Sequence, residues 1–204
     1  MARLSRQTIV ETALELLDRV GLDELSTRKL ADALGVQSPA LYWHFKNKRA
    51  LLDAMAEAMF DQAQMPPPPQ PSDDPAEWLA RRQLAFRRAL LARRDGARVH
   101  AGSRPNPAQL PSIAAQVEAL AAAGLDSVAA LLAIRALSRY TVGWVLEEQA
   151  DSERSDHAAY PEMADYPALR KARKVLAEPD PDADFTFGLT ALIDGLIRQA
   201  QPRR

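Results

Sequence analysis

Residues 26–49, STRKLADALGVQSPALYWHFKNKR, constrain the fold more than any other stretch of this chain. Their pattern predicts two short helices joined by a tight turn. Ser26 can cap the first helix with its hydroxyl group, and Gly35 can adopt the left-handed conformation that ends it. Val36 then fills the turn. The apolar positions of the first helix are Leu30, Ala33 and Leu34.

The second helix is predicted to begin at Ser38, because a capping hydroxyl followed by proline at the first helical position is a strong start signal. It ends near His44, and Asn47 can cap the helix that follows. Two short helices with aromatic and basic side chains on the second have the layout of a helix-turn-helix that docks in the DNA major groove. The rest of the chain should therefore support and control a DNA-reading head.

The remaining sequence is also predicted to be helical, so we expect an all-α fold. An amphipathic helix over residues 5–20 ends at Gly21 and completes a three-helix head. Residues 64–75 are rich in proline and cannot be helical, because proline lacks the backbone N–H and clashes with the preceding turn. Further helices are expected over residues 76–93, 95–100, 107–123, 127–151, 165–177 and 183–200, with a polar, irregular segment over 151–164. The expected divisions are a head over 1–47, a connecting helix over 48–64 and a larger domain over 65–204.

Composition limits the class of protein. The chain has 204 residues and no cysteine, which excludes disulfides and thiolate metal sites. We find no apolar run of 18 residues and no signal-peptide pattern, so we expect a soluble cytoplasmic protein with no membrane partner. The net charge is −1, but residues 1–50 carry eight Lys and Arg against six Asp and Glu. The small basic excess therefore lies where DNA phosphates would be.

Side chains on the helix-turn-helix suit different parts of DNA. Arg28 can reach a base edge or a phosphate, and small side chains at the start of the second helix can meet thymine methyl groups. Hydroxyl, indole and ammonium donors further along suit phosphates. We expect DNA contacts from Thr27, Arg28, Gln37, Ser38, Pro39, Ala40, Tyr42, Trp43, His44 and Lys48. Leu41 and Phe45 should be core residues, and Trp43 could pack there instead of facing DNA.

The block from Leu14 to Ala50 resembles the N-terminal domain of the TetR family of bacterial transcriptional repressors. Its end, LYWHFKNKRALLD, is similar to the tetracycline-responsive branch. Further matches are FRRALL at 86–91, RDGARVH at 94–100, GSRP at 102–105, LEEQ at 146–149 and the FxxGLxxLI spacing from Phe185. The resemblance covers nearly the whole chain. It implies a homodimeric repressor that binds double-stranded operator DNA and is released by a tetracycline-like small molecule, with residues 65–204 as the ligand-binding and dimerisation domain.

The resemblance also implies an effector site with a magnesium ion. His100 would bind the ion that the drug's keto-enolate oxygens chelate, while Glu147 and the Ser103 hydroxyl would hold its water ligands. One nitrogen with several oxygens fits octahedral magnesium. On the residues alone, Glu147 is a carboxylate on an apolar helix, which is costly without a partner. The other implied ligand contacts are Gln64, Arg82, Phe86, Arg104, Pro105, Ile113, Gln116, Val117, Leu131 and Ile134.

Three residues depart from the family pattern. The family's drug-anchoring histidine is Gln64 here and its anchoring asparagine is Arg82, so the metal-binding end of the site looks kept and the amide-binding end changed. Gln64 can still donate and accept, whereas Arg82 cannot accept a hydrogen bond and adds a charge. The base-reading glutamine of the family is Ser38, which puts the operator sequence in doubt. A weaker tetracycline sensor and a sensor for a related polyketide both fit.

Helices near 127–147 and 183–200 are apolar with no wholly polar face. They could form one buried core, but the resemblance implies a four-helix bundle with a second copy, and a dimer reads two half-sites. By the same resemblance, ligand shifts the loop at 100–105 and the helix at 95–100. These push the helix from Asn47 to Ala63 and swing the heads out of register.

Two other functions stay open at this point. His100 with Glu147 could be a catalytic pair, but no nucleophile accompanies them and a DNA-reading head has no role in an enzyme, so we expect no catalysis. A TetR-type regulator could also sense another polyketide or a lipophilic molecule without metal. Activation in place of repression is open too.

Overall fold

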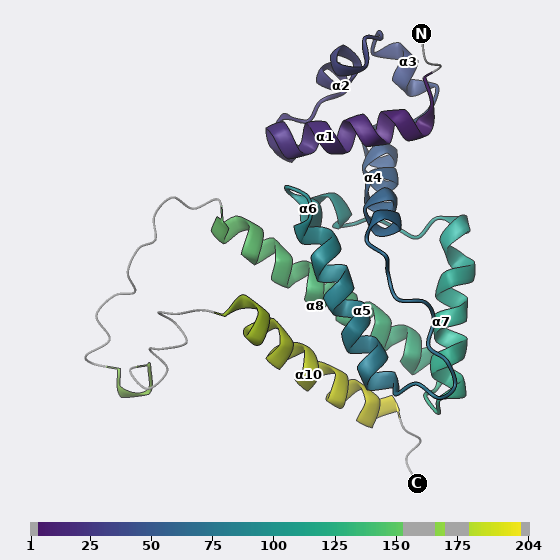
Figure 1. The fold of residues 1–204 in the computed structure, drawn as a ribbon, viewed down its shortest axis with the longest axis vertical. Coiled ribbons are helices and arrows are strands. Elements are labelled where there is room, and N and C mark those ends of the chain that lie inside the picture. The colour runs from purple at the N-terminus through teal and green to yellow at the C-terminus, as the bar shows by residue number, and fades with distance from the viewer. Residues whose placement is uncertain (1–3, 153–165, 170–179, 201–204) are drawn as a thin grey trace.

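The computed structural model describes residues 4–152, 166–169 and 180–200, and this part of the chain is helical with no strand. A small three-helix head lies at one end, one helix leads away from it, and longer helices form the rest (Figure 1). The elements are α1 (Arg6–Glu24), α2 (Thr27–Leu34), α3 (Pro39–Tyr42), α4 (Lys48–Gln62), α5 (Pro75–Leu91), α6 (Gly96–His100), η1 (Pro107–Gln109), α7 (Leu110–Ala122), α8 (Ser127–Ser152) and α10 (Pro181–Ala200). The all-α prediction is confirmed.

Helix α1 forms the base of the head. It buries one apolar stripe that includes Ile9, Ala13, Leu14 and Leu17. Its helical path breaks at Gly21, where φ is 76°, a backbone conformation that glycine adopts without steric cost. The break turns the chain toward α2 near the predicted position.

Helix α2 begins and ends as predicted. The Ser26 Oγ accepts a hydrogen bond from the Lys29 backbone N–H at 3.2 Å, and Gly35 is left-handed at φ 66°. The apolar side differs from the prediction in one residue. Ala33 is exposed and Ala31 is buried, because the face of α2 that packs on the rest of the head includes Ala31.

Ser38 does not cap α3, and that prediction is wrong. Its φ of −49° and ψ of −38° are already helical, so its hydroxyl is not placed to accept from the first helical amides. The Ala40 N–H donates to the Gln37 carbonyl at 2.9 Å instead. Pro39 is still the first residue of the helix, as predicted.

Helix α4 connects the head with the larger domain. The Asn47 Oδ1 accepts from the Ala50 backbone N–H at 2.9 Å, which confirms the predicted cap. Met55 and Met59 are buried on α4 in one apolar cluster that runs from α1 through α4 to α5, α6 and α8. Packing therefore ties the head to the helices below it, with no solvated gap between them.

The proline-rich segment after α4 is not helical, as predicted. Gln64 has a positive φ of 48° just beyond α4. The Trp78 indole N–H donates to the Pro67 carbonyl at 2.7 Å, which holds the segment against α5. Asp74 caps α5 by accepting from the Ala76 N–H at 2.8 Å.

The larger domain packs α8 against α5, α7 and α10 (Figure 1). Its second apolar cluster is centred on Trp78, Leu120, Leu137, Phe185 and Leu189, which are almost fully buried. Helix α8 is the only element of the described chain that is long and apolar enough to cross a membrane, a test that core helices also pass. Only 28% of that apolar stretch is buried within the protomer, so packing on three helices accounts for part of the composition and leaves apolar side chains of α8 on the surface.

Two predicted segments fall largely outside the described residues. The irregular segment over 151–164 lies outside them from residue 153, and the helix over 165–177 is described only at 166–169, of which 167–169 are helical. The helix predicted over 107–123 starts as the short 3-10 helix η1 and continues as α7.

Candidate DNA-binding head and effector site

Several expected DNA-contacting residues lie on the surface of the head. Trp43 is 90% exposed and Tyr42 is exposed beside it, so the alternative that Trp43 is a core residue is wrong. Leu41 and Phe45, as predicted, are buried beneath them. Among the rest, Arg28, Gln37, Pro39 and Lys48 are exposed, and Thr27, Ser38, Ala40 and His44 are half-buried. Exposed aromatic rings held by a small core are available to a partner.

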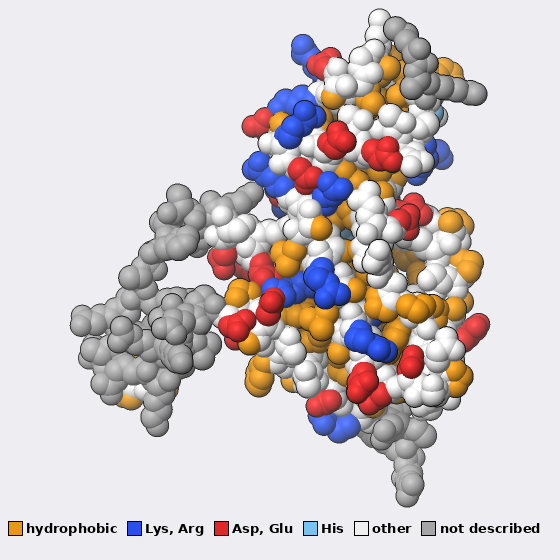
Figure 2. Space-filling view, viewed as in Figure 1, with side chains coloured by type: hydrophobic (Ala, Val, Ile, Leu, Met, Phe, Trp, Pro, Cys, Tyr) orange, Lys and Arg blue, Asp and Glu red, His pale blue; other side chains and the backbone are white. Residues whose placement is uncertain are grey.

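Two contacts that the sequence did not predict fix this surface from behind. The Arg6 guanidinium lies 4.5 Å from the Phe45 ring centroid and donates to the His44 carbonyl at 3.3 Å. The Lys48 ammonium donates to the Leu25 carbonyl at 2.8 Å, which ties the start of α4 to the end of α1. Lys48 keeps two further N–H donors. Charges on the visible face of the head are mixed, with acidic side chains among the basic ones (Figure 2).

His100 ends α6 and packs against two aromatic rings that also contact each other, with their centroids 5.1 Å apart. The Phe60 and Phe86 ring centroids each lie 5.2 Å from the imidazole centroid, both edge-on. Burial lowers the pKa of His100 to about 4, with a smaller contribution from the positive charge of Arg49. The Ser103 Oγ lies 3.3 Å from His100 Nδ1. The imidazole is therefore neutral at pH 7 and can act as a metal ligand.

The loop after His100 is tied to α4 at two places. Arg49 donates to the Ala101 carbonyl at 3.0 Å while it pairs with Asp53 on its own helix at 2.6 Å. Asn106 donates through Nδ2 to Glu57 at 2.8 Å. A displacement of this loop therefore acts directly on α4.

The remaining expected ligand contacts differ in burial. Phe86 and Gln116 are buried, and the Gln116 side-chain amide donates to the Ser112 hydroxyl at 3.2 Å. Arg82 is half-buried with its guanidinium 5.7 Å from the Trp78 ring centroid. Of the others, Ile113, Val117 and Ile134 are half-buried, and Gln64, Arg104, Pro105 and Leu131 are exposed.

The Glu147 side chain is exposed in the protomer, so water solvates its carboxylate there. The carboxylate that faces inward from α8 is the next residue, Glu148. It receives two hydrogen bonds from the buried Arg87, at 2.5 and 2.8 Å, and Arg87 also pairs with Asp182 on α10. The Arg87 guanidinium lies 5.0 Å from the Phe185 ring centroid. The sequence clue to this ion pair is Arg87 itself, a basic residue directly after Phe86.

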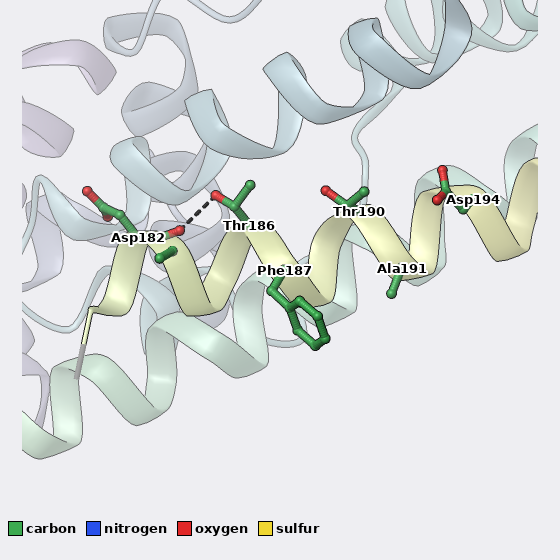
Figure 3. A pocket seen from close by; sticks show the side chains of 7 residues that line it. Asp182, Thr186, Phe187, Thr190, Ala191 and Asp194 are labelled. Carbon is green, nitrogen blue, oxygen red and sulfur yellow. Dashed lines mark hydrogen bonds between the residues drawn. The ribbon is translucent and has the colours of Figure 1, made fainter. Parts of the chain in front are cut away.

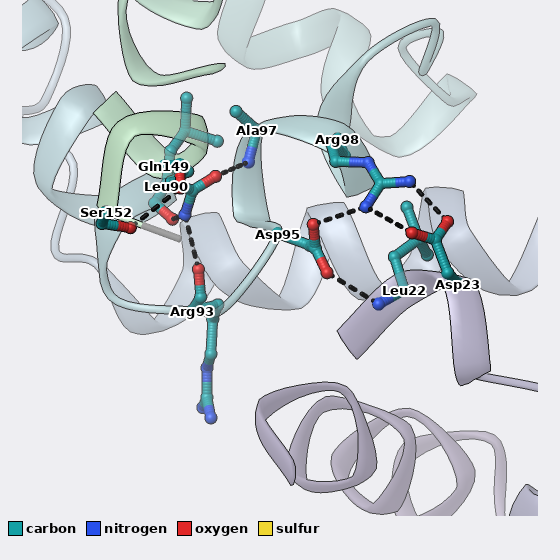
Figure 4. Close-up of polar contacts among 9 residues, drawn as sticks. All are labelled: Leu22, Asp23, Leu90, Arg93, Asp95, Ala97, Arg98, Gln149 and Ser152. Carbon is teal, nitrogen blue, oxygen red and sulfur yellow. Dashed lines mark hydrogen bonds and ion pairs between the residues drawn. The ribbon is translucent and has the colours of Figure 1, made fainter. Parts of the chain in front are cut away.

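A polar cluster joins the head to the opposite end of α6 (Figure 4). Asp95, buried and left-handed at φ 56°, accepts from the Leu22 backbone N–H at 2.7 Å and from Arg98 at 2.8 Å. Arg98 also pairs with Asp23 at 2.6 Å. From α8, the Gln149 side chain accepts from the Ala97 N–H at 3.2 Å. Helix α6 therefore contacts the head at its start and carries His100 at its end.

The outer face of α10 carries a shallow, open hollow of about 740 Å³. Phe187 projects from it and is 81% exposed (Figure 3). The lining residues are Asp182, Ala183, Thr186, Phe187, Thr190, Ala191 and Asp194. Helix α8, which packs against α10, also exposes Val128, Leu131 and Leu132. Large apolar side chains on two neighbouring helices therefore lack a partner within the protomer.

Both parts of the chain match a known protein family. Residues 9–55 match the family described as bacterial regulatory proteins, tetR family, and residues 67–200 match the tetracyclin repressor-like, C-terminal domain. The chain is 47% identical to tetracycline repressor protein class A from transposon 1721 of Escherichia coli, over 98% of this chain and 93% of the relative. It is 44% identical to the class G protein of Vibrio anguillarum, over 97% and 96%.

Two solved structures share the fold and carry drugs. A TetR variant from Acinetobacter baumannii AYE in complex with minocycline has a TM-score of 0.81 at 42% identity, covering 98% of this chain and 100% of the other. TetR (class A) in complex with 5a,6-anhydrotetracycline and magnesium has a TM-score of 0.75 at 42% identity, covering 96% and 99%. Relatives of this chain at 44–47% identity are tetracycline repressors. The chain therefore belongs to the tetR family of bacterial regulatory proteins.

Proposed function

We propose that a tetracycline-like molecule chelated to magnesium is the ligand that releases this DNA-binding repressor from its operator. The observation that carries the proposal is the His100 imidazole, which is neutral at pH 7 and packed edge-on against Phe60 and Phe86. Because Nδ1 faces the Ser103 hydroxyl, Nε2 is the nitrogen available to a metal. The relative that was solved with 5a,6-anhydrotetracycline and magnesium supports this choice of ligand.

The donor set fits magnesium that arrives with its ligand. No group of three or more His, Asp or Glu side chains in the described residues could hold a metal by itself. Magnesium prefers oxygen ligands in octahedral geometry and keeps several waters. His100 would hold the ion, with Ser103 and Glu147 binding its waters, and the ion would fix the drug's keto-enolate oxygens.

The head and the helices α8 and α10 supply the two macromolecular surfaces. We assign the exposed face that carries Tyr42 and Trp43 to operator DNA, where hydroxyl and indole donors meet phosphates. We assign the α10 hollow with Phe187 to the second copy of this homodimer. A protein with this role acts in the cytoplasm, on two half-sites of a palindromic operator.

Release from DNA follows from what α6 touches. A ligand that binds His100 acts on one end of α6 and on the loop after it, which is bonded to Arg49 and Glu57 of α4. The other end of α6 is bonded through Asp95 to Leu22 in the head. Induction requires only that the ligand prefer the arrangement in which the heads no longer match the operator.

The test is a titration of the purified dimer with tetracycline in magnesium, followed by drug fluorescence, and repeated with a chelator. We expect saturable binding that the chelator abolishes and that also dissociates an operator duplex. His100→Ala should lose the drug response and keep DNA binding. His44→Ala, the same substitution in the head, is the matched control and should leave drug binding unchanged.

Other outcomes would point elsewhere. Drug binding that is insensitive to chelator, or that survives His100→Ala, would contradict the magnesium site and favour a metal-free sensor of a lipophilic ligand. If the drug released the His100→Ala variant from the operator as well as it releases the unmodified protein, the magnesium site would also be contradicted.

A further inference from the structure

Arg82 differs from every other arginine that the described fold buries. Four arginines in the described residues are at least partly buried: Arg49, Arg82, Arg87 and Arg93. Three of them pair with a carboxylate at 2.6 Å or less, Arg49 with Asp53, Arg87 with Glu148 and Arg93 with Asp18. Arg82 has no such partner among the described residues. The Arg82 guanidinium instead lies over the face of the Trp78 ring.

The missing partner has an energetic consequence. Arg82 is half-buried and none of its nitrogens is fully shielded from solvent, so its guanidinium loses part of its hydration and no acceptor within the described residues replaces it. That partial loss costs free energy. Burial accordingly lowers the pKa of Arg82, whereas the carboxylate hydrogen bonds of Arg87 raise the pKa of that group. The Trp78 ring offsets part of the cost for Arg82, since a cation over an aromatic face is attracted to it. The N–H donors in the plane of the Arg82 guanidinium have no carboxylate acceptor among the described residues.

The position of Arg82 links it to the effector site. Trp78, Arg82 and Phe86 are spaced by four residues on α5 and share one face of that helix. Phe86 is the ring that packs against His100. One helical turn separates Arg82 from Phe86, a rise of about 6 Å. A ligand that is anchored at His100 and extends along α5 would need a length of roughly two fused rings to reach the Arg82 guanidinium.

We propose that Arg82 binds an anionic group, a carboxylate, at the end of the effector opposite its metal-chelating edge. This inference rests on the proposed function and specifies the ligand class. The planar guanidinium presents paired donors that match a carboxylate, and Trp78 supplies a flat surface beside it. The effector is then an acidic, flat, polycyclic hydroxy-ketone.

The experiment compares two probes that differ only at this end. Both are 1,8-dihydroxyanthraquinones, one with a 3-carboxylate and the other with a 3-carboxamide, so the chelating hydroxy-ketone edge is identical. Dissociation constants are measured by calorimetry with magnesium at pH 7 for the full-length dimer, for Arg82→Gln and for Arg88→Gln. Arg88 is an exposed arginine on the same helix and serves as the matched control.

We expect the protein to bind the acid about tenfold more tightly than the amide, as a charge-assisted pair of hydrogen bonds provides. Arg82→Gln should bring this ratio close to one, and Arg88→Gln should keep it. Equal binding of both probes by the unmodified protein, or an unchanged ratio in Arg82→Gln, would overturn the inference. If tetracycline still binds with magnesium in that case, the proposed function stands and only the ligand class is wrong.

A measurement without ligand tests the same assignment. Replacing an arginine that lacks an acceptor by a flexible apolar side chain removes the desolvation cost, so Arg82→Met should raise the melting temperature of the ligand-free dimer. Arg87→Met should lower it, because Glu148 would lose its partner. A lower melting temperature for Arg82→Met would show that the guanidinium is satisfied inside the fold, and the assignment would fail.

Discussion

His100 should make the ligand-free protein sensitive to acid in a defined pH window. Its pKa is about 4 in the folded chain and about 6.5 when unfolded, because burial against aromatic rings disfavours the imidazolium. Between these values the unfolded state binds a proton more readily. The contribution to stability is therefore fully present above pH 6.5 and is lost as the pH falls toward 4. From pH 7 to pH 4.5 the loss is about 2.5 kcal/mol per protomer.

The assay is urea unfolding of the dimer at one fixed protomer concentration, with chelator present and no effector. His100→Asn removes the titrating group and keeps a polar side chain of similar size. The free energy of unfolding of the unmodified protein minus that of the variant should fall by about 2.5 kcal/mol between pH 7 and pH 4.5. Taking the difference cancels other titrating groups that the two proteins share.

A pH-independent difference would refute the reasoning. It would mean that the imidazole is solvated enough to accept a proton in the folded state, and the neutral ligand on which the metal site depends would lose its physical basis. A difference that grows toward acid would reverse the sign of the argument and place an acidic partner beside the ring.

Four further substitutions test the fold and the head. Gly96→Ala should destabilise the dimer by more than about 3 kcal/mol in urea unfolding, because a Cβ there would lie 2.1 Å from a backbone carbonyl oxygen; a near-neutral result would contradict this packing. Ser26→Ala should cost about 1 kcal/mol of unfolding free energy and Ser38→Ala less than about 0.5, because only the first hydroxyl caps a helix; equal costs would restore the cap at the second serine. Trp43→Ala should leave the melting temperature unchanged, because the ring is 90% exposed. It should weaken operator binding about tenfold in a mobility-shift titration, because a phosphate would lose its indole donor; unchanged DNA affinity would remove Trp43 from the interface.

Features set by neighbouring residues were predictable from the sequence. Caps at Ser26 and Asn47 and the left-handed Gly35 depend on hydrogen bonds and backbone conformations within a few residues. Leu41 and Phe45 are four residues apart and both buried, and the Phe45 N–H just beyond α3 donates to the Leu41 carbonyl at 3.0 Å. In each case the local chemistry and the tertiary fold agree.

Sequence patterns were insufficient where neighbouring residues could satisfy the same role. Ser38 has the right chemistry for a cap, but its own backbone already takes helical angles and its hydroxyl caps no amide of α3. Glu147 and Glu148 differ by one position, and one position is about 100° around a helix. Only the position of Arg87, 61 residues away on α5, decides which of the two carboxylates faces inward. Such pairing is tertiary information that periodicity does not contain.

The contacts of α6 also explain why a small ligand could move a whole head. Its link to α1 combines a partly buried hydrogen bond from Leu22 to Asp95 with an Arg98 to Asp23 pair in which the Asp23 side chain is 82% exposed. Exposed pairs contribute little net stability, so rearranging them costs little. The packing around His100 is apolar and close, and close-packed groups transmit displacement instead of absorbing it. A shift at His100 would therefore leave the aromatic contacts intact and be taken up where α6 meets the head. Coupling of this kind needs only a few kcal/mol of ligand preference, which chelation at one neutral imidazole and a charged contact at Arg82 could supply together.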